Sequence, residues 1–358
     1  MSEERTYIVI MAGGRGTRFW PRSRAEEPKQ LLDILGGRTM LQETCARVSG
    51  FVPDERLLVV TGSPHAAPVR EQLPWLPPGN IISEPVGRDT AACICLAATR
   101  IQREDPGAVM CVLPADHHIA DAERFRAVLR MACAAARAGE ALVTIGIVPR
   151  GPETGYGYIQ YDRGSEKDGV FRVRRFHEKP GLEDAQRYIA GSDCVWNSGM
   201  FAWKNSVIMQ ELADRLPDIH GAVLPVAEAW GTARIDAAIA DAYACVPSIS
   251  IDRGVLEKAD TVCMVRGDFG WNDIGSWSAV YDTCPKDACG NVLQGDVYTC
   301  NARGCLVQTA GTTVAVVGLD DVVVVQTGDA LLVCRRDCCQ DVRKIVEQLD
   351  KQGRSELL

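Results

Sequence analysis

The chain has 358 residues, of which 46% are hydrophobic and 24% charged, and its formal net charge is −8. This balance is typical of a globular protein with enough apolar side chain for a large core. The acidic charge and the lack of a long basic run argue against nucleic acid as the main partner, because phosphate backbones are bound by Lys/Arg surfaces. No apolar stretch approaches the ~18 residues of a membrane helix, and the first residues are polar rather than a signal peptide. We therefore expect a cytoplasmic protein without membrane contact.

Fifteen cysteines raise the question of disulfides or a metal centre. No two of them have the C-x-x-C spacing, which argues against zinc ribbons and thioredoxin-like motifs. Cys93, Cys95, Cys111 and Cys133 lie among apolar residues, where thiols pack as small hydrophobic side chains. We expect reduced, structural cysteines.

The first part of the chain alternates strand-like and helix-like segments. Strands are expected at residues 7–11, 56–61, 80–83, 109–113 and 142–148, and helices from Thr39, at 90–104 and at 121–138. Gln42 follows Thr39 at the spacing of a capping box. Repeated strand–helix–strand units with apolar strands predict an α/β fold with a mostly parallel sheet that is covered on both faces. Because ligands of such sheets bind beyond the carboxyl ends of the strands, the loops after Met11, Ser83 and Leu113 are the first candidates for chemistry.

The sequence pattern changes after residue 291. Short β-branched runs at 305–309, 313–317, 322–326 and 331–334 alternate with Gly, Asn and Asp, and a terminal helix is expected at about 337–352. We expect a catalytic domain over residues 1–283 and a small C-terminal β-unit with its helix over 284–358.

The loop after the first strand has the composition of a phosphate-binding loop. Gly13, Gly14 and Gly16 allow backbone N–H groups to turn toward an anion, Arg15 and Arg18 add positive charge, and Lys29 follows in a Pro-Lys pair. Phe19 stands where the third glycine of a dinucleotide-binding loop would be, so an oxidoreductase of that kind is not expected. A tight glycine turn beside solvated charges is the alternative interpretation of this loop.

Seven motifs in order resemble the sugar-nucleotide pyrophosphorylases, and Thr17-Arg18-Phe19-Trp20-Pro21 resembles the mannose-1-phosphate guanylyltransferases among them. They span most of residues 7–292. The motifs are Ala12-Gly13-Gly14-x-Gly16-Thr17-Arg18 with Pro28-Lys29, Ser83-Glu84-Pro85-x-Gly87-Arg88-Asp89-Thr90-Ala91, Leu113-Pro114-Ala115-Asp116-His117, Glu153-Thr154-Gly155-Tyr156-Gly157-Tyr158-Ile159, Phe176-x-Glu178-Lys179-Pro180, Trp196-Asn197-Ser198-Gly199-Met200-Phe201 and Phe269-Gly270-Trp271-x-Asp273-x-Gly275-Ser276-Trp277.

The resemblance implies a Rossmann-like, GT-A-like nucleotidyltransferase fold with a β-helix-like C-terminal unit, a homodimer, and transfer of GMP from GTP to mannose 1-phosphate with Mg²⁺. The expected catalytic residues are Arg18, Lys29 and Asp116, and the expected metal ligands are Asp116 and Asp273. The expected nucleotide-binding residues are Ala12, Gly13, Gly14, Gly16, Thr17, Arg18, Lys29, Glu84, Pro85 and Arg88, and the expected sugar-phosphate-binding residues are Gly157, Glu178, Lys179 and Asn197.

Several alternatives stay open at this point. Asp116 is also compatible with a helix cap or a turn, and Asp273 with a structural hydrogen bond to the backbone. Glu178 and Lys179 are also compatible with a solvated ion pair. His117 and His118 are interpreted as structural, because Mg²⁺ prefers oxygen ligands. The chain departs from the family's usual residues at Phe19, Asp89 and Asn272. Other functions to weigh are the same reaction with another nucleotide or another hexose or heptose 1-phosphate, and a non-catalytic sensor of sugar nucleotides.

Overall fold

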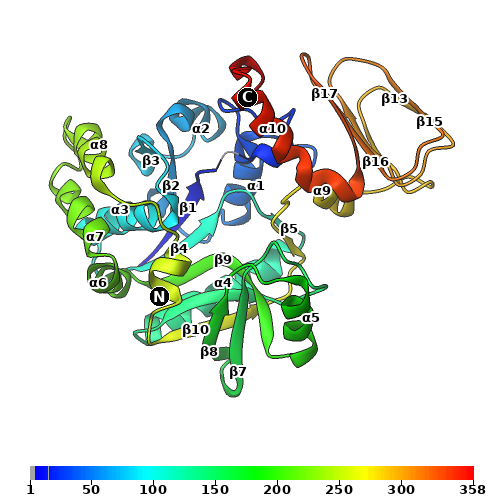
Figure 1. Ribbon diagram of the computed structural model, residues 1–358. Helices are drawn as coiled ribbons and strands as arrows, with labels where there is room; N and C mark the ends of the chain where they lie inside the picture. Colours follow the sequence, from blue (N-terminus) through cyan, green and yellow to red (C-terminus); the bar gives the residue numbers. More distant parts are fainter. Residues whose placement is uncertain (1–4, 15) are drawn as a thin grey trace. The chain divides into compact units, whose positions relative to one another are not determined.

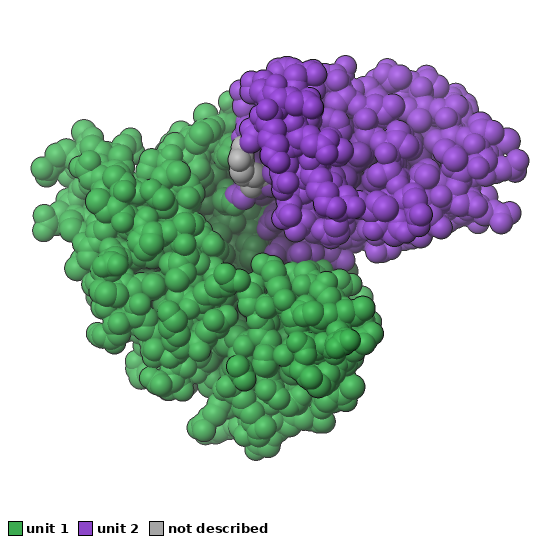
Figure 2. All heavy atoms as spheres, in the orientation of Figure 1, with its two compact units in different colours: residues 1–13, 45–115, 119–271 green, residues 14–44, 116–118, 272–358 purple. Residues whose placement is uncertain are grey.

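The computed structural model describes residues 5–14 and 16–358, so the expected cation Arg15 lies outside the described residues. The chain divides into two compact units, coloured separately in Figure 2. Unit 1 contains residues 1–13, 45–115 and 119–271, and unit 2 contains residues 14–44, 116–118 and 272–358. By packing, segments 14–44 and 116–118 thus belong with the C-terminal part of the chain. The expected domain boundary at 283/284 stays a prediction.

Unit 1 is built on a sheet of nine strands. Their order is β3 (Ile81–Glu84), β2 (Leu57–Gly62), β1 (Thr6–Ala12), β4 (Val109–Pro114), β9 (Cys194–Lys204), β6 (Leu142–Ile147), β10 (Val262–Gly267), β8 (Val170–His177) and β7 (Tyr158–Lys167). β1 to β4 pair in parallel, as do β6 and β10, whereas β9 and β8 are antiparallel to their neighbours. In the described sheet seven of the nine strands therefore run in one direction, which confirms the expected mostly parallel sheet.

The helices of unit 1 are α2 (Ala66–Gln72), α3 (Asp89–Glu104), α4 (Ala122–Ala138), α5 (Leu182–Gly191), α6 (Asn205–Arg215), α7 (Pro217–Val223), α8 (Ile235–Cys245) and a π-helical turn at Asp252–Leu256, with short 3-10 turns at Asp54–Arg56, Ser63–His65, Pro78–Asn80 and Leu224–Glu228. Most helices of unit 1 pack directly on this sheet, whereas α7 packs on the neighbouring helices α3, α6 and α8 (Figure 1). Cys93, Cys95, Cys111 and Cys133 are buried free thiols, as expected. Across the described residues no helix combines the length and apolar character needed to span a bilayer.

Helix ends follow the signals in the sequence. Asp121 precedes α4, where its carboxylate accepts a hydrogen bond from the Arg124 N–H over 2.9 Å, and Gly139 ends the helix. Helix α1 (Met40–Arg47) begins after a capping box in which Thr39 and Gln42 exchange two hydrogen bonds of 3.2 Å. Such reciprocal bonds satisfy N–H groups that the first helical turn leaves unpaired. Both expected helix starts are confirmed.

Strand register places several loops at one edge of the sheet. Met11 of β1 lies opposite Pro114 of β4, and Gly62 of β2 lies opposite Glu84 of β3. Since these strands are parallel, the residues that follow them emerge at the same edge. The glycine-rich loop, the Glu84 segment and the segment entering Asp116 all begin there, which is where ligands of such sheets bind.

Unit 2 contains the C-terminal β-unit. Strands β12 (Val292–Gln294), β14 (Leu306–Thr309) and β16 (Val322–Gln326) stack in parallel, β17 (Leu331–Arg335) adds an antiparallel edge, and β13 (Val297–Cys300) pairs in parallel with β15 (Val314–Val317). Two sheets of successive parallel rungs enclose a small apolar core around Cys305 and Val307. This arrangement is β-helix-like, as expected (Figure 1).

The rest of unit 2 packs on a second apolar cluster. Its helical segments are η1 (Thr17–Phe19), η2 (Lys29–Leu31), α9 (Trp277–Thr283), η8 (Arg336–Asp341), α10 (Val342–Lys351) and η9 (Ser355–Leu357). The two-residue strands β5 (His118–Ile119) and β11 (Trp271–Asn272), which pair with each other, each have one residue in either unit. The Phe19 ring meets the Trp277 ring edge-on at 5.2 Å, and the Trp277 indole N–H donates to the Trp20 carbonyl over 3.1 Å. Val342 of α10 belongs to the same cluster. This core fixes η1, α9 and α10 against one another.

Candidate active site

A cavity of about 380 Å³ in unit 2 collects most of the expected phosphate- and metal-binding residues. Its lining residues come from five separate segments of the chain. They are Gly16, Thr17, Arg18, Phe19, Lys29, Asp116, His117, Asp273, Ile274, Gly275 and Arg343. The structure therefore brings together six predicted residues of the loop, the Pro-Lys pair and the two acidic motifs.

Gly16 is required by the geometry of the loop. Its φ of 57° lies in the left-handed region, and a Cβ at this position would come within 2.5 Å of the Lys29 Cβ. Only glycine combines that backbone conformation with so close an approach. The Gly14 carbonyl accepts a 3.2 Å hydrogen bond from the Gln30 side chain, which ties the loop to the segment that carries Lys29.

Lys29 lies between the two acidic motifs. Its ammonium donates to the Asp116 carboxylate over 2.9 Å and to the Asp273 backbone carbonyl over 2.6 Å. The Lys29 side chain is 5% exposed and that of Asp116 is 37% exposed. Burial alone would raise the pKa of the Asp116 carboxyl, but the charges of Lys29 and His117 and the hydrogen bonds outweigh this, so the pKa lies below its ordinary value. Asp116 is thus held as a carboxylate at the mouth of the cavity.

Asp273 sits in a strained turn. The next residue, Ile274, has a φ of 46°, which is rare for a β-branched side chain. The Asn272 side chain accepts a 2.7 Å hydrogen bond from the Ile274 N–H and so supports this conformation. Strain of this kind persists only where the surroundings impose it, and it often marks functional sites. The departure at Asn272 therefore has a structural explanation, since its side chain supplies the acceptor that the turn uses.

The donor set of the cavity fits magnesium. Asp116 and Asp273 both line it, and Mg²⁺ is usually held by one or two carboxylates together with waters and substrate phosphates. Across residues 5–14 and 16–358, no group of three or more His, Cys, Asp or Glu side chains is arranged to hold a metal by itself. His117 lines the cavity with its Nε2 3.9 Å from an Asp116 oxygen. These residues can hold a Mg²⁺ ion only if phosphate oxygens and waters complete its coordination.

In unit 1, the expected base-binding residues lie at the ends of β1 and β3. Glu84 is buried, and a Cβ on Gly13 would lie 3.8 Å from one of its carboxylate oxygens. The Tyr243 hydroxyl of α8 donates to Glu84 over 2.7 Å, and Arg88 Nε donates to the Tyr243 carbonyl over 3.3 Å. Burial raises the Glu84 pKa from 4.5 to about 7, against the effect of the Tyr243 hydrogen bond.

The other expected residues near this segment differ in exposure, with Ala12 buried and Pro85 and Asp89 exposed. Ala12 ends β1, where its carbonyl accepts a 3.0 Å hydrogen bond from the Thr61 hydroxyl, and Pro85 is exposed. Asp89 opens α3 with a φ of 63°, and its carboxylate accepts from the Thr90 N–H over 2.7 Å. Asn and Asp tolerate the left-handed conformation better than most residues. The replacement of the usual Asn by Asp89 is therefore compatible with the backbone.

The expected sugar-binding residues also come together in unit 1. A Cβ on Gly157 would lie 2.8 Å from a Glu178 oxygen and 3.5 Å from the Asn197 Cβ, so a larger residue there would displace the Glu178 carboxylate. The Asn197 N–H donates to the Gly157 carbonyl over 2.8 Å. The side-chain amide of Asn197 donates to Asp252 over 2.7 Å and accepts from the Gly199 N–H over 3.2 Å. Asn197 keeps one further donor and one further acceptor site for a ligand.

Lys179 lies at the exposed end of this group. Its φ of 43° marks a tight turn after β8, its ammonium is 3.0 Å from Glu178, and its side chain is 62% exposed. An exposed pair of this kind contributes little to stability. The ammonium can therefore leave Glu178 for a phosphate at small cost.

Three further residues of these sites were not predicted from the sequence. Asp252 is half-buried beside Asn197, and burial raises its pKa from 3.8 to about 6, although the Asn197 hydrogen bond works in the opposite direction. The Tyr243 hydroxyl is hydrogen-bonded to Glu84, and Arg343 lines the cavity that contains Lys29 and Asp116. None stands in one of the seven motifs. For Asp252, the one available signal was an acidic residue directly after the alternating Ser-Ile-Ser-Ile run.

These features define an α/β protein with a mostly parallel sheet in unit 1 and, in unit 2, a cavity lined by a glycine-containing loop, a lysine and two aspartates. The chain belongs to the nucleotidyl transferase family, which matches residues 7–289, and a MannoseP isomerase/GMP-like beta-helix domain matches residues 295–349. The resemblance inferred from the seven motifs is thereby confirmed, as is the β-helix-like nature of the C-terminal unit.

Curated relatives cover nearly the whole chain. It is 43% identical to a mannose-1-phosphate guanylyltransferase of Escherichia coli, over 99% of this chain and 76% of that protein. It is 41% identical to the alginate biosynthesis protein AlgA of Pseudomonas aeruginosa, over 97% of this chain and 73% of that protein. A solved structure from Thermus thermophilus, described as a mannose-1-phosphate geranyltransferase, matches with a TM-score of 0.86 and 35% identity, over 97% of this chain and 99% of that one.

Proposed function

We propose that this protein transfers GMP from GTP to mannose 1-phosphate and releases pyrophosphate, giving GDP-mannose. The observation that carries the proposal is the cavity in which Lys29 joins Asp116 and Asp273, beside Arg18 and the glycine-rich loop. The choice of guanine and mannose is supported by the names of relatives that are about 42% identical.

In this reaction a phosphate oxygen of mannose 1-phosphate attacks the α-phosphorus of GTP. The new P–O bond forms as the bond to the β-phosphate bridging oxygen breaks, and pyrophosphate departs with that oxygen and its electron pair. Both substrates are anionic, so catalysis consists mainly of positioning and charge neutralisation. Arg18 and Lys29 are proposed to bind the triphosphate and the departing pyrophosphate, while the backbone N–H groups of Gly13, Gly14 and Gly16 approach the phosphates.

Asp116 and Asp273 are proposed to hold Mg²⁺. When bound, the ion neutralises phosphate charge and orients the reacting oxygens. Lys29 has a second function in this arrangement: it keeps Asp116 ionised, and its bond to the Asp273 carbonyl fixes the turn that carries the second carboxylate. Lys29 is therefore proposed to organise the metal carboxylates as well as to meet phosphate.

The sugar phosphate is proposed to bind in unit 1. Glu178 and Asn197 can exchange hydrogen bonds with mannose hydroxyls, and Gly157 leaves room for the sugar ring to approach the backbone. Asp252 fixes the orientation of the Asn197 amide. Lys179 is proposed to exchange its exposed pairing with Glu178 for the phosphate of mannose 1-phosphate.

Glu84 and Arg88 are proposed to line the base pocket, with Tyr243 holding both of them. A cytoplasmic location and a homodimer are also part of the proposal. The family resemblance supports both, and apolar side chains exposed on the C-terminal β-unit add support for the dimer.

The test is pyrophosphate release with Mg²⁺ from a panel of nucleotides and sugar phosphates. We expect turnover with GTP only when mannose 1-phosphate is present. Equal turnover with UTP and glucose 1-phosphate would contradict the choice of base and sugar while leaving the reaction class intact. Binding of GDP-mannose without turnover of any pair would favour the non-catalytic sensor.

A further inference from the structure

The C-terminal helix α10 supplies a cation to the phosphate cavity. Val342, the first residue of α10, is buried in the apolar cluster with Phe19 and Trp20, and Val346 and Leu349 pack against the same cluster. The helix thereby packs on η1, the turn that carries Arg18. Arg343 follows Val342 directly and lines the cavity with Arg18, Lys29 and Asp116. Its position is fixed by the same core that fixes the loop.

The present partner of Arg343 is easy to exchange. Its Nε lies 3.2 Å from Glu347 one helical turn away, and the two side chains are 59% and 53% exposed. Exposed pairs of this kind on a helix surface contribute little to stability. The guanidinium has N–H donors on both Nη atoms in addition to Nε, in a planar fork that matches phosphate oxygens.

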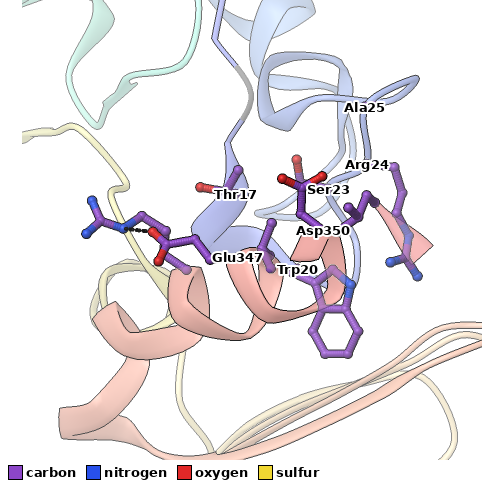
Figure 3. A pocket seen from close by; sticks show the side chains of 10 residues that line it. Thr17, Trp20, Ser23, Arg24, Ala25, Glu347 and Asp350 are labelled. Atoms are coloured by element: carbon purple, nitrogen blue, oxygen red, sulfur yellow. Dashed lines mark ion pairs between the residues drawn. The ribbon is translucent and has the colours of Figure 1, made fainter. Parts of the chain in front are cut away.

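Space on the other side of Arg343 allows the side chain to move. Arg343 and Thr17 also line a second cavity of about 210 Å³, between the loop after η1 and α10. In Figure 3, Trp20 and Ser23 of the loop and Glu347 and Asp350 of the helix border this cavity, and the ion pair to Glu347 is drawn at its edge. Because there is open space next to the side chain, the guanidinium can turn from Glu347 toward a phosphate without disturbing the core.

The charge of the cavity favours this movement. Among the described lining residues, Lys29 is already neutralised by Asp116, and Asp273 adds a second carboxylate. A triphosphate or pyrophosphate carries several negative charges, so Arg18 and a metal ion alone leave charge to be balanced. We propose that Arg343 binds phosphate oxygens of the nucleotide and of the released pyrophosphate, which makes α10 part of the active site. This inference rests on the proposed function.

The experiment is calorimetric titration with magnesium pyrophosphate of the full chain and of R343A, R343K and R343Q. Loss of a charge-assisted contact predicts pyrophosphate binding about tenfold to hundredfold weaker in R343A and R343Q, and a smaller loss in R343K. Lys344 neighbours Arg343 on α10 and pairs with Asp341, and it does not line the cavity, so K344A is the matched control and should bind like the parent chain.

Two further readouts separate phosphate binding from helix packing. Kinetics should show a raised KM for GTP in R343A with little change in KM for mannose 1-phosphate, and the melting temperature of R343A should equal that of K344A. R343Q keeps most of the aliphatic part of the side chain. It replaces R343A in the test if R343A has a lower melting temperature than the parent chain. Unchanged pyrophosphate affinity in R343Q would overturn the inference. Pyrophosphate is common to every reaction of this class, so the titration is independent of whether guanine and mannose are the right choice.

Discussion

The Lys29 ammonium lies 2.9 Å from Asp116 and 2.6 Å from the backbone carbonyl of Asp273, so one buried cation joins the two acidic motifs. These residues are far apart in the chain, and no local rule of secondary structure predicts their contact. A buried charge that loses its partner is costly. Changes at Lys29 or Asp116 should therefore affect both the local structure and the chemistry.

The two lysines are expected to act on different substrates. K29A should weaken the use of GTP and K179A the use of mannose 1-phosphate, each by about tenfold to hundredfold in kcat/KM, because each change removes a charge-assisted contact. K29A should also lower the melting temperature, because it leaves Asp116 without its counter-ion, whereas K179A should not. Steady-state kinetics with each substrate varied in turn, and K258A as an exposed control, measure both effects. Exchanged phenotypes would show that the two phosphates are assigned the wrong way round.

The metal proposal predicts that D116A and D273A each lose Mg²⁺-dependent turnover while remaining folded, although D116A should melt earlier because it leaves the buried Lys29 without its counter-ion. Each variant removes one of two carboxylates that line the same cavity. Turnover across a Mg²⁺ titration, with circular dichroism to check folding, provides the measurement, and D268N on the exposed surface is the control. Near-normal rates at low Mg²⁺ in either variant would show that this aspartate has a structural function only.

Glu84 predicts a pH dependence of stability. Burial raises its pKa to about 7 from 4.5, so between these values the folded state binds more protons than the unfolded state. The contribution of Glu84 to the free energy of unfolding is fully present below pH 4.5 and is lost as the pH rises through 7. This loss is on the order of 3 kcal/mol. In urea unfolding experiments from pH 5 to 8, the free energy of unfolding should fall more steeply with pH in the parent chain than in E84Q. Since the Tyr243 hydrogen bond lowers the Glu84 pKa, the decrease in the free energy of unfolding should occur at higher pH in Y243F. Identical slopes in the parent chain and E84Q would contradict this account.

The C-terminal β-unit predicts a homodimer. β17 is an edge strand, and Leu331 and Val333 on it are 56% and 57% exposed, with Tyr298 and Val317 exposed on the other sheet. An uncovered apolar edge invites pairing with another chain. Light scattering at micromolar concentration should report a dimer, and L331E with V333E should give a monomer. A monomeric parent chain, or a dimer unaffected by both changes, would exclude this interface.

The sequence predicted the strand and helix pattern of the first half well, because apolar periodicity and caps are local signals. Thr39 with Gln42, and Asp121 before α4, show this. The antiparallel insertion of β9 between β4 and β6 was not foreseen, because strand direction depends on where a long connection returns the chain.

The candidate site was predicted as far as its motifs reach. The glycine loop and Asp116 carry local signals of turn and charge, and the structure places them with Lys29 as neighbours. Arg343, Tyr243 and Asp252 were missed because each acts through a tertiary contact: packing of α10 on η1, a hydroxyl from α8, and an amide held across two segments. Ile274 carried no sequence signal for its positive φ.

The most direct test of the central claim follows the oxygen atoms. Mannose 1-phosphate labelled with ¹⁸O at its three non-bridging phosphate oxygens is incubated with GTP, Mg²⁺ and the protein, and the products are weighed by mass spectrometry. Attack by the sugar phosphate on the α-phosphorus predicts GDP-mannose that retains all of the label and pyrophosphate that carries none. Label in the pyrophosphate, or no GDP-mannose while GTP is consumed, would contradict the account.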